Sequence, residues 1–269
     1  MINTPNRDNL QKIVILNPKG GSGKTTLATN LASFYARRGP PPTLMNCDPQ
    51  GYSMRWLEKR GGDRAVIYGV SACEQDALEN GRLNPEIAHE SRELIVDLPA
   101  AIAPDKLYEQ TYDADSILIP VLPSEIDIHS AAQFIAELLL IAQIDRRDRR
   151  LAIVANRTRQ NTLSLQMLTR FLSSLQIPLI AQFRDSQNFV TAAAAGIGIC
   201  EMPVYKVKTD LEQLNAVVDW LDQWRMRKST VPALASAKYN PDAEMPSLIS
   251  SSSGRQRADI AGLRSSGDR

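Results

Sequence analysis

The sequence has few cysteines, no long apolar run and almost no excess charge of either sign. Its three cysteines, Cys47, Cys73 and Cys200, form no Cys-x-x-Cys pair, so neither a disulfide scaffold nor a cysteine-based metal site is expected. The apolar runs are far shorter than the roughly 20 residues that span a bilayer. The polar segment from Met1 to Gln11 does not resemble a signal peptide. We therefore expect a cytoplasmic protein.

The formal net charge of +1 excludes a protein whose whole surface is basic, but it is compatible with a local basic patch. The 269 residues suffice for one α/β domain with a buried sheet. Hydrophobic residues make up 43% of the chain and charged residues 23%, which is typical of a globular protein.

Short apolar runs alternate with longer helical patterns along most of the chain. The predicted strands cover residues 12–17, 43–47, 93–97, 116–121, 151–156 and 178–181. The predicted helices cover residues 27–38, 104–112, 127–144, 163–175, 187–195 and 210–226. This alternation predicts an α/β fold with a mostly parallel, doubly wound sheet and helices on both faces. Ligands of such sheets bind at the carboxyl ends of the strands, where Asn17, Asp48, Asp97 and Asn156 are expected.

A glycine-rich segment, Lys-Gly-Gly-Ser-Gly-Lys-Thr-Thr at residues 19–26, follows the first predicted strand and opens a helix at Lys24. Its glycines permit backbone conformations that point consecutive N–H groups at a phosphate, and the helix N-terminus adds partial positive charge. Lys24 supplies a charge for the β- and γ-phosphates, and the Thr25 hydroxyl suits Mg²⁺. The sequence therefore predicts a P-loop NTPase that holds ATP and Mg²⁺, the alternative being a glycine turn without a ligand. The predicted nucleotide-binding residues of the loop are Gly20, Gly21, Ser22, Gly23, Lys24, Thr25 and Thr26.

The additional lysine at position 19 distinguishes this loop from an ordinary P-loop. The segment resembles the deviant Walker A motif, KGGxGKT[ST], of the ParA/MinD family of positioning ATPases. In that family two subunits enclose ATP between them, and the signature lysine reaches the phosphates of the partner subunit. The resemblance implies that Lys19, together with Lys24, is catalytic and that ATP produces a homodimer. A solvated loop lysine is the alternative for Lys19.

Two aspartates complete the predicted catalytic site. Residues 46–51 resemble the family's D-x-D-P-Q-G switch I motif, with Asn46 in place of the first aspartate. The resemblance implies that Asp48 orients the attacking water near the metal, and the loss of a charge at Asn46 is expected to retune the site. Asp97 ends an apolar strand and precedes Leu98-Pro99, as in the family's D-x-P switch II, where a carboxylate can hold a magnesium-bound water. The predicted metal site is thus Thr25, Asp48 and Asp97. A simple Asp-Pro turn and a helix cap are the respective alternatives for the two aspartates.

Later segments resemble the adenine side of the family. Asn156-Arg157 matches its Asn-Arg pair, and the segment ending in Glu201-Met202-Pro203 matches its late loop. The resemblance implies that Asn156 reads the adenine edge and that Pro203 lies against the base. A turn asparagine that ends a strand is the alternative for Asn156.

ParA-type members bind DNA without sequence preference in the ATP-bound dimer. The matching cations here are Lys206, Lys208, Arg225, Arg227 and Lys228. Contacts of this kind with phosphates are sensitive to salt. A solvated helix end, with its cations near the negative end of the dipole, is the alternative.

The expected organisation is a flexible N-terminus at 1–11, a ParA-like ATPase domain at 12–228 and a disordered Ser/Pro-rich tail at 229–269. Because only about eleven residues precede the first predicted strand, we expect no additional operator-binding domain. The tail has no basic stripe opposed to large apolar residues, so membrane attachment is disfavoured.

The resemblance implies a nucleoid-associated ATPase of the bacterial cytoplasm, with weak basal activity that an adaptor stimulates. The leading cargo is the carboxysome, with a carboxysome adaptor, and plasmid partition with a ParB-like adaptor is second. Two other readings remain: a metabolic P-loop ligase or reductase of the same fold, and a membrane-bound MinD-like regulator of the division site. A cluster-bearing reductase needs bridging cysteines that this chain does not place in switch II.

Overall fold

The computed structural model describes residues 10–71, 91–100, 102–145 and 150–223. The chain divides into two units, Met1–Val231 and Pro232–Arg269, and all described residues belong to the first. Residues 1–9 of the predicted N-terminus and the whole predicted tail lie outside the described residues. The predicted domain boundaries therefore stay predictions.

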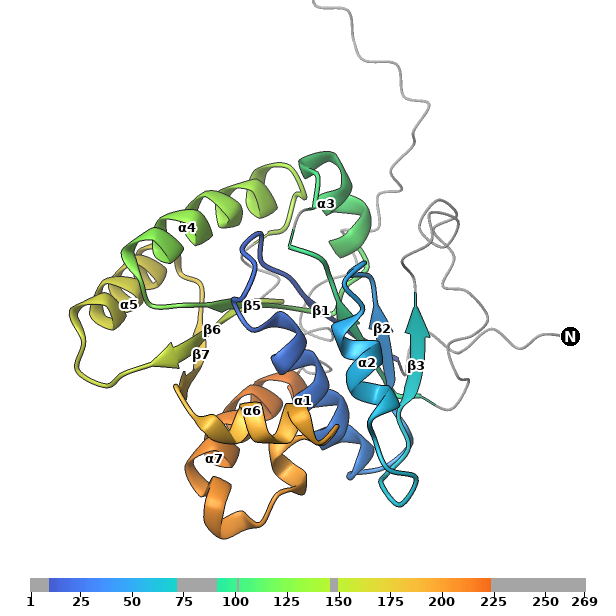
Figure 1. The fold of residues 1–269 in the computed structure, drawn as a ribbon. Coiled ribbons are helices and arrows are strands. Elements are labelled where there is room, and N and C mark those ends of the chain that lie inside the picture. The colour runs from blue at the N-terminus through green and yellow to red at the C-terminus, as the bar shows by residue number, and fades with distance from the viewer. Residues whose placement is uncertain (1–9, 72–90, 101, 146–149, 224–269) are drawn as a thin grey trace, which may run out of the picture. The chain divides into compact units, whose positions relative to one another are not determined.

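One parallel sheet of seven strands organises the described part of the chain (Figure 1). Its order is β3-β2-β4-β1-β5-β6-β7, and each pair of neighbours is parallel. The strands are β1 (Gln11–Ile15), β2 (Thr43–Asn46), β3 (Tyr68–Ser71), β4 (Glu93–Asp97), β5 (Ser116–Val121), β6 (Leu151–Thr158) and β7 (Leu179–Arg184). The predicted fold class is confirmed. The strand order changes direction around β1, which creates a switch point where ligands of such sheets bind.

Helices cover both faces of the sheet (Figure 1). On one face α3 (Pro104–Thr111), α4 (Glu125–Leu140) and α5 (Leu163–Leu175) enclose a cluster of buried apolar side chains. The second cluster lies under the helices of the other face. These helices are α1 (Lys24–Ala36), α2 (Tyr52–Glu58), α6 (Gln187–Ala194) and α7 (Val204–Asp222), and a short 3₁₀ turn, η3 (Ile199–Glu201), precedes α7.

The sequence pattern missed two elements, α2 and β3. Helix α2 has only seven residues, too few for an apolar repeat to become recognisable. Strand β3 is an edge strand of four residues, two of which, Gly69 and Ser71, are exposed. Its extended conformation is stabilised by backbone pairing with β2, which the local sequence does not reveal.

Several predicted boundaries were wrong by a few residues. Strand β1 begins at Gln11 and ends at Ile15, so Asn17 lies in the loop. Helix α4 begins at Glu125, because the Ser124 hydroxyl accepts a hydrogen bond from Asp127 N and caps it. It ends at Leu140 rather than at residue 144.

Helix α7 begins at Val204, directly after Pro203, instead of at Asp210. Its first turn is exposed, and the fully buried Asp210 interrupts the apolar pattern. That carboxylate is paired with Arg184, whose Nε lies 2.6 Å away. Because both features come from tertiary contacts, periodicity alone predicted a helix that starts too late.

Candidate functional site

The sheet register brings the ends of β1, β2 and β4 together. Asp97, the last residue of β4, pairs with Ile15 of β1 and with Asn46 of β2. The glycine-rich loop leaves the sheet just after Ile15, and the Asp48 loop leaves it just after Asn46. The loop, Asp48 and Asp97 therefore meet at one edge of the sheet.

The glycine-rich loop has the backbone that an anion cradle needs. Gly21 and Gly23 adopt positive φ angles of 75° and 103°, which only glycine tolerates readily. A Cβ on Gly23 would lie 2.1 Å from Nδ2 of Asn156. Asn17 anchors the loop: its Nδ2 donates to the Pro120 carbonyl at 2.7 Å, and its Oδ1 accepts from Lys19 N at 2.8 Å. The cradle is thus preformed.

Lys24, the first residue of α1, is buried at the base of this cradle. Its Nζ donates to the carbonyl oxygens of Asn17 and Lys19 at 3.1 and 3.2 Å. Burial lowers the pKa of Lys24, while the negative charges of Asp97 and Asp48 offset part of that effect. The ammonium group therefore lies in a desolvated place where an added phosphate would be bound strongly.

Asp97 is fully buried, and neither of its carboxylate oxygens makes a hydrogen bond of standard geometry. Burial raises the pKa of Asp97 to about 6, although the nearby Thr25 and Ser53 hydroxyls and the charge of Lys24 act in the opposite direction. The Ser22 hydroxyl is also buried without a hydrogen-bond partner. Such orphaned polar atoms require an explanation, and a bound cation and phosphate would supply it.

The oxygen donors here fit Mg²⁺. In the described part of the chain, no group of three or more His, Cys, Asp or Glu residues forms a metal site from side chains alone. Mg²⁺ at nucleotide sites is commonly held by one or two carboxylates together with substrate phosphates. Asp97 and the Thr25 hydroxyl, with Asp48 close enough to influence the pKa of Asp97, match that arrangement.

Asn46 organises the Asp48 loop through its amide. Its Nδ2 donates to the carbonyl of Asp48 at 2.9 Å, and its Oδ1 accepts from the Ser53 hydroxyl at 2.9 Å. An aspartate could not donate the first of these bonds. Asp48 itself accepts a hydrogen bond from Gln50 N at 2.9 Å, so the carboxylate also stabilises its own turn. Sequence reasoning missed Ser53, because α2 was not predicted and a lone serine carries no signal.

Lys19 is paired within its own subunit. Its Nζ lies 2.5 Å from Oδ1 of Asp127, and 38% of its side chain remains exposed. Asp127 also accepts a hydrogen bond from the Ser124 hydroxyl. Asp127 was predicted as the first residue of a helix, and its contact with the loop was not predicted. Lys19 would therefore have to break its ion pair with Asp127 before it could reach the phosphates of a partner subunit.

The predicted adenine residues do not form one cluster. Asn156 Nδ2 donates to the Ser22 carbonyl at 2.8 Å, and Asn156 Oδ1 accepts from Arg157 N at 2.9 Å. The amide of Asn156 therefore holds the glycine-rich loop at Ser22, a role that the sequence did not reveal. Arg157 is exposed, with a φ of 50°, and it borders a pocket of about 310 Å³ together with Asp127. The adenine-reading role of Asn156 stays a prediction.

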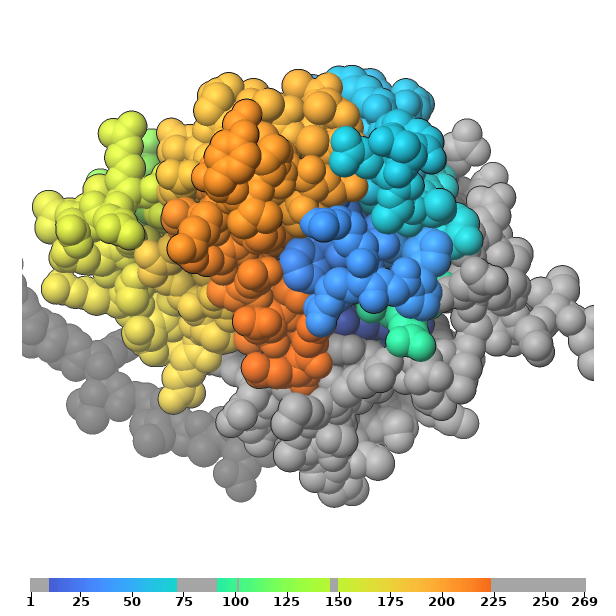
Figure 2. All heavy atoms as spheres, turned by 90° about the horizontal axis from the view of Figure 1, so that it is seen from below, coloured from blue at the N-terminus to red at the C-terminus, as the bar shows by residue number. Residues whose placement is uncertain are grey.

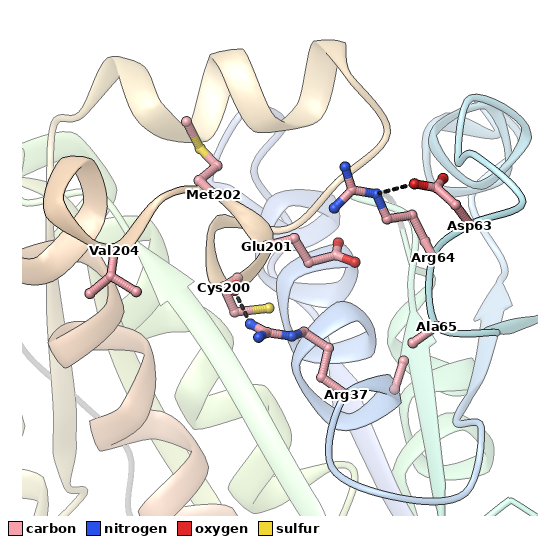
Figure 3. A pocket seen from close by; sticks show the side chains of 9 residues that line it. Arg37, Asp63, Arg64, Ala65, Cys200, Glu201, Met202 and Val204 are labelled. Atoms are coloured by element: carbon pink, nitrogen blue, oxygen red, sulfur yellow. Dashed lines mark hydrogen bonds and ion pairs between the residues drawn. The ribbon is translucent and has the colours of Figure 1, made fainter.

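Pro203 lies elsewhere, at the start of α7. Its neighbours Met202 and Val204 line a larger cavity of about 480 Å³ beside Arg37, Glu201 and the Cys200 carbonyl (Figure 3). This cavity is at the end of α1 away from Lys24, a distance of about 18 Å at roughly 1.5 Å per residue. The larger cavity is therefore not the phosphate site.

The predicted DNA contacts are only partly described. Lys206 and Lys208 are exposed on the first two turns of α7, a helix that forms part of the surface seen in Figure 2. The Lys206 ammonium lies 5.8 Å from the ring centroid of Tyr205, whose side chain is itself 82% exposed. Arg225, Arg227 and Lys228 lie outside the described residues.

Comparison with known proteins decides the family. Residues 13–199 match the model of the CobQ/CobB/MinD/ParA nucleotide binding domain. The chain belongs to this family. The matched residues include the glycine-rich loop, Asp48 and Asp97, and the ParA and MinD members of the family are ATPases.

Individual relatives of the same family support this assignment. The chain is 24% identical over 209 residues to the maintenance of carboxysome distribution protein A of Halothiobacillus neapolitanus, which covers 77% of this chain and 94% of that protein. It is 31% identical over 141 residues to a ParA protein of Rhizobium radiobacter, covering 50% of this chain and 60% of the relative.

A solved structure shows the same fold. An ATP complex of a single-residue variant of McdA from Cyanothece superposes with a TM-score of 0.59 at 15% identity, covering 82% of this chain and 97% of that one. None of the helices in the described ranges is both long and apolar enough to cross a membrane.

Proposed function

We propose that the chain is a ParA-type ATPase that closes an ATP-bound homodimer, binds DNA without sequence preference and positions an intracellular cargo with an adaptor that stimulates hydrolysis. The observation that carries the proposal is the buried, unpaired carboxylate of Asp97 beside Lys24 and Thr25. A carboxylate in this state gains most from a divalent cation and a phosphate.

Each residue of the site has a separate role in the proposed hydrolysis. The loop amides and Lys24 hold the β- and γ-phosphates, and Asp48 orients a water molecule for attack on the γ-phosphorus. Thr25, Asp48 and Asp97 would hold Mg²⁺, which when bound neutralises phosphate charge. Because Lys19 is held by Asp127 within one subunit, the charge on the γ-phosphate is incompletely stabilised until a second subunit contributes its lysine. This supports slow basal hydrolysis that a partner accelerates.

The relatives suggest the cargo. The carboxysome distribution protein is matched over 94% of its length, whereas the ParA protein is matched over 60%. We therefore place carboxysome positioning, with a carboxysome adaptor, first and plasmid partition with a ParB-like adaptor second. Both would place the protein on the nucleoid in the cytoplasm.

The dimer is tested with a hydrolysis trap. We expect ATP and Mg²⁺ to convert the Asp48→Ala variant from monomer to dimer, because Thr25, Asp97 and Lys24 remain to hold Mg²⁺ and ATP while the attacking water is no longer oriented. Adding Lys19→Ala in the same background should leave it monomeric, since the cation that reaches the partner is lost. Light scattering coupled to size-exclusion chromatography measures both.

The matched control for the dimer test is Asp127→Asn, which releases Lys19 from its ion pair but keeps the lysine. This variant should dimerise at least as readily as the unmodified protein. A persistently monomeric Asp48→Ala protein at saturating ATP and Mg²⁺ would show that the trans role of Lys19 is wrong.

DNA binding is tested at α7. Replacing both Lys206 and Lys208 with alanine should weaken ATP-dependent binding to random-sequence DNA and reduce the salt slope by about 1 for each phosphate that is no longer neutralised. The control is Lys106→Ala, which removes an exposed lysine from α3 on the other face of the sheet. A gel shift over a salt series measures the effect. Equal binding by the double variant and the control would exclude these two lysines as DNA-binding residues.

A further inference from the structure

Glu201 is a buried carboxylate outside the phosphate site, and only 4% of its side chain is exposed. It ends η3, the 3₁₀ turn between α6 and α7. The two carboxylate oxygens accept hydrogen bonds from Nη1 and Nη2 of Arg60, both at 2.7 Å. Oε2 also accepts from the Ser33 hydroxyl at 2.6 Å and from Gly198 N at 2.9 Å. Its oxygens are therefore held by three separate segments of the chain.

Arg60 follows the C-terminal end of α2 and is equally enclosed, with 5% of its side chain exposed. Its Nε and Nη2 donate to the Ala65 carbonyl at 3.1 and 3.0 Å, and its guanidinium lies 5.6 Å from the Trp56 ring centroid. Trp56 Nε1 in turn donates to the Ile197 carbonyl at 3.3 Å. The end of α2 is thus held against residues 197–201 at two points, Ile197 and Glu201.

This loop approaches both neighbouring helices too closely for side chains. A Cβ on Gly196 would lie 2.7 Å from the Lys59 carbonyl carbon, and one on Gly198 would lie 2.5 Å from Ser33. Ile199 N also donates to Oδ1 of Asn30 at 2.8 Å. The loop therefore packs closely between α1 and the end of α2, with one hydrogen bond to Asn30 of α1 and one from Trp56 of α2.

The other ends of these two helices form the nucleotide site. The first turn of α1 contains Lys24 and Thr25. The first turn of α2 contains Ser53, which contacts Asn46 and lowers the pKa of Asp97, and Asp48 lies just before that turn. A rigid tie at one end of a short helix sets the position of the other end. Glu201, which contacts both helices, can therefore set the distance between α1 and α2.

The charge state of the tie suits this role. Burial by itself raises the pKa of Glu201, but hydrogen bonds from Arg60 and Ser33 outweigh it and hold the pKa below its usual range. The pair is therefore ionised at neutral pH, and it cannot exchange partners with water in the way an exposed ion pair can.

We propose that Glu201 and Arg60 are positioning residues for ATP hydrolysis. They hold α2 so that Asp48 and Ser53 face the first turn of α1. The proposal rests on the ATPase function proposed above. It predicts an effect on the rate of hydrolysis rather than on ATP binding, because the cradle and Lys24 are positioned by β1, Asn17 and Asn156.

The test uses Glu201→Gln in the full chain. The amide keeps the shape of the side chain but leaves Arg60 without its counter-charge. We expect kcat to fall about tenfold or more, since misplacement by about 1 Å can cost up to about a hundredfold. The Kd for a non-hydrolysable ATP analogue should stay within about threefold of the unmodified protein. Amide hydrogen exchange in residues 46–58 should accelerate in the analogue-bound state.

The matched control is Asp222→Asn, which removes the carboxylate of the exposed Arg38–Asp222 ion pair and should change none of these quantities. Ser33→Ala, which removes a single hydrogen bond to Glu201, should give an intermediate loss of kcat and covers the case in which Glu201→Gln folds poorly. All assays are run well below the unfolding midpoints of the variants.

Two results would overturn the proposal. The first is that amide hydrogen exchange in residues 46–58 of both Glu201→Gln and Ser33→Ala is as slow as in the control Asp222→Asn. The second is that ATP affinity falls by as large a factor as kcat. If the unmodified protein itself hydrolyses no ATP, the proposed function fails, while hydrogen exchange still decides whether the tie positions α2.

Discussion

Replacing Asp97 with asparagine is expected to stabilise the nucleotide-free protein and to slow its magnesium-dependent ATP hydrolysis by about a hundredfold or more. The carboxylate is fully buried without a standard hydrogen bond, and burial raises its pKa from 3.8 to about 6. The folded state therefore binds a proton that the unfolded state has already lost between these two values. The unmodified protein loses stability as the pH rises through this window, by roughly 3 kcal/mol once it is above about pH 6.

Urea unfolding without nucleotide, at about pH 4 and about pH 8, measures this difference. Asp97→Asn should be similar to the unmodified protein at the lower pH and more stable at the higher one. Asp113→Asn is the control, because it removes a carboxylate that is already paired with Lys12 at 2.5 Å. An Asp97→Asn protein that is less stable at the higher pH would mean that the buried charge is already compensated in the free protein.

The same variant should lose hydrolysis by about a hundredfold or more, because an amide lacks the charge that would stabilise a metal-bound site. Hydrolysis by Asp97→Asn at the unmodified rate would remove Asp97 from the metal site.

In the unmodified protein at subsaturating Mg²⁺, affinity for magnesium-ATP should decline as the pH falls below about 6 and Asp97 takes up a proton. Isothermal calorimetry at several pH values measures the affinity.

Replacing Lys24 with alanine is expected to weaken ATP binding itself, by about a hundredfold or more, because a charge-assisted bond to phosphate in a desolvated site is lost. Lys24 is buried at the base of the cradle, and its charge also acts on Asp97. Without it the pKa of Asp97 should rise further, so magnesium binding is weakened as well. Titration with a fluorescent ATP analogue measures the effect.

The informative comparison is with Lys19→Ala. Lys19 is paired with Asp127 within its own subunit and is more exposed than the buried Lys24, so this variant should keep ATP binding while losing the dimer. Lys12→Ala, which removes a lysine paired with Asp113, is the control for loss of a cation. Equal ATP affinity in Lys24→Ala and Lys12→Ala would mean that the loop does not hold phosphate through Lys24.

The fold was predictable from the sequence where strands are buried on both faces. Runs such as residues 117–121 are apolar throughout because helices cover both faces of the sheet, and this signal is local. Helix α2 and strand β3 carry no such signal, because one is two turns long and the other lies at the sheet edge. The start of helix α7 was predicted too late because Asp210, a charged residue at a buried position, is paired with Arg184 of β7.

The sequence by itself determined the phosphate loop and the two aspartates that follow neighbouring strands. These features depend on spacing along the chain and on the rule that parallel strands end at the same edge. Only the tertiary structure decided that Asp97 is buried without a hydrogen bond of standard geometry, that Lys19 is paired with Asp127, and that Asn156 supports the loop. Desolvation and contacts between residues more than a hundred positions apart arise when helices and strands pack, so no local pattern encodes them.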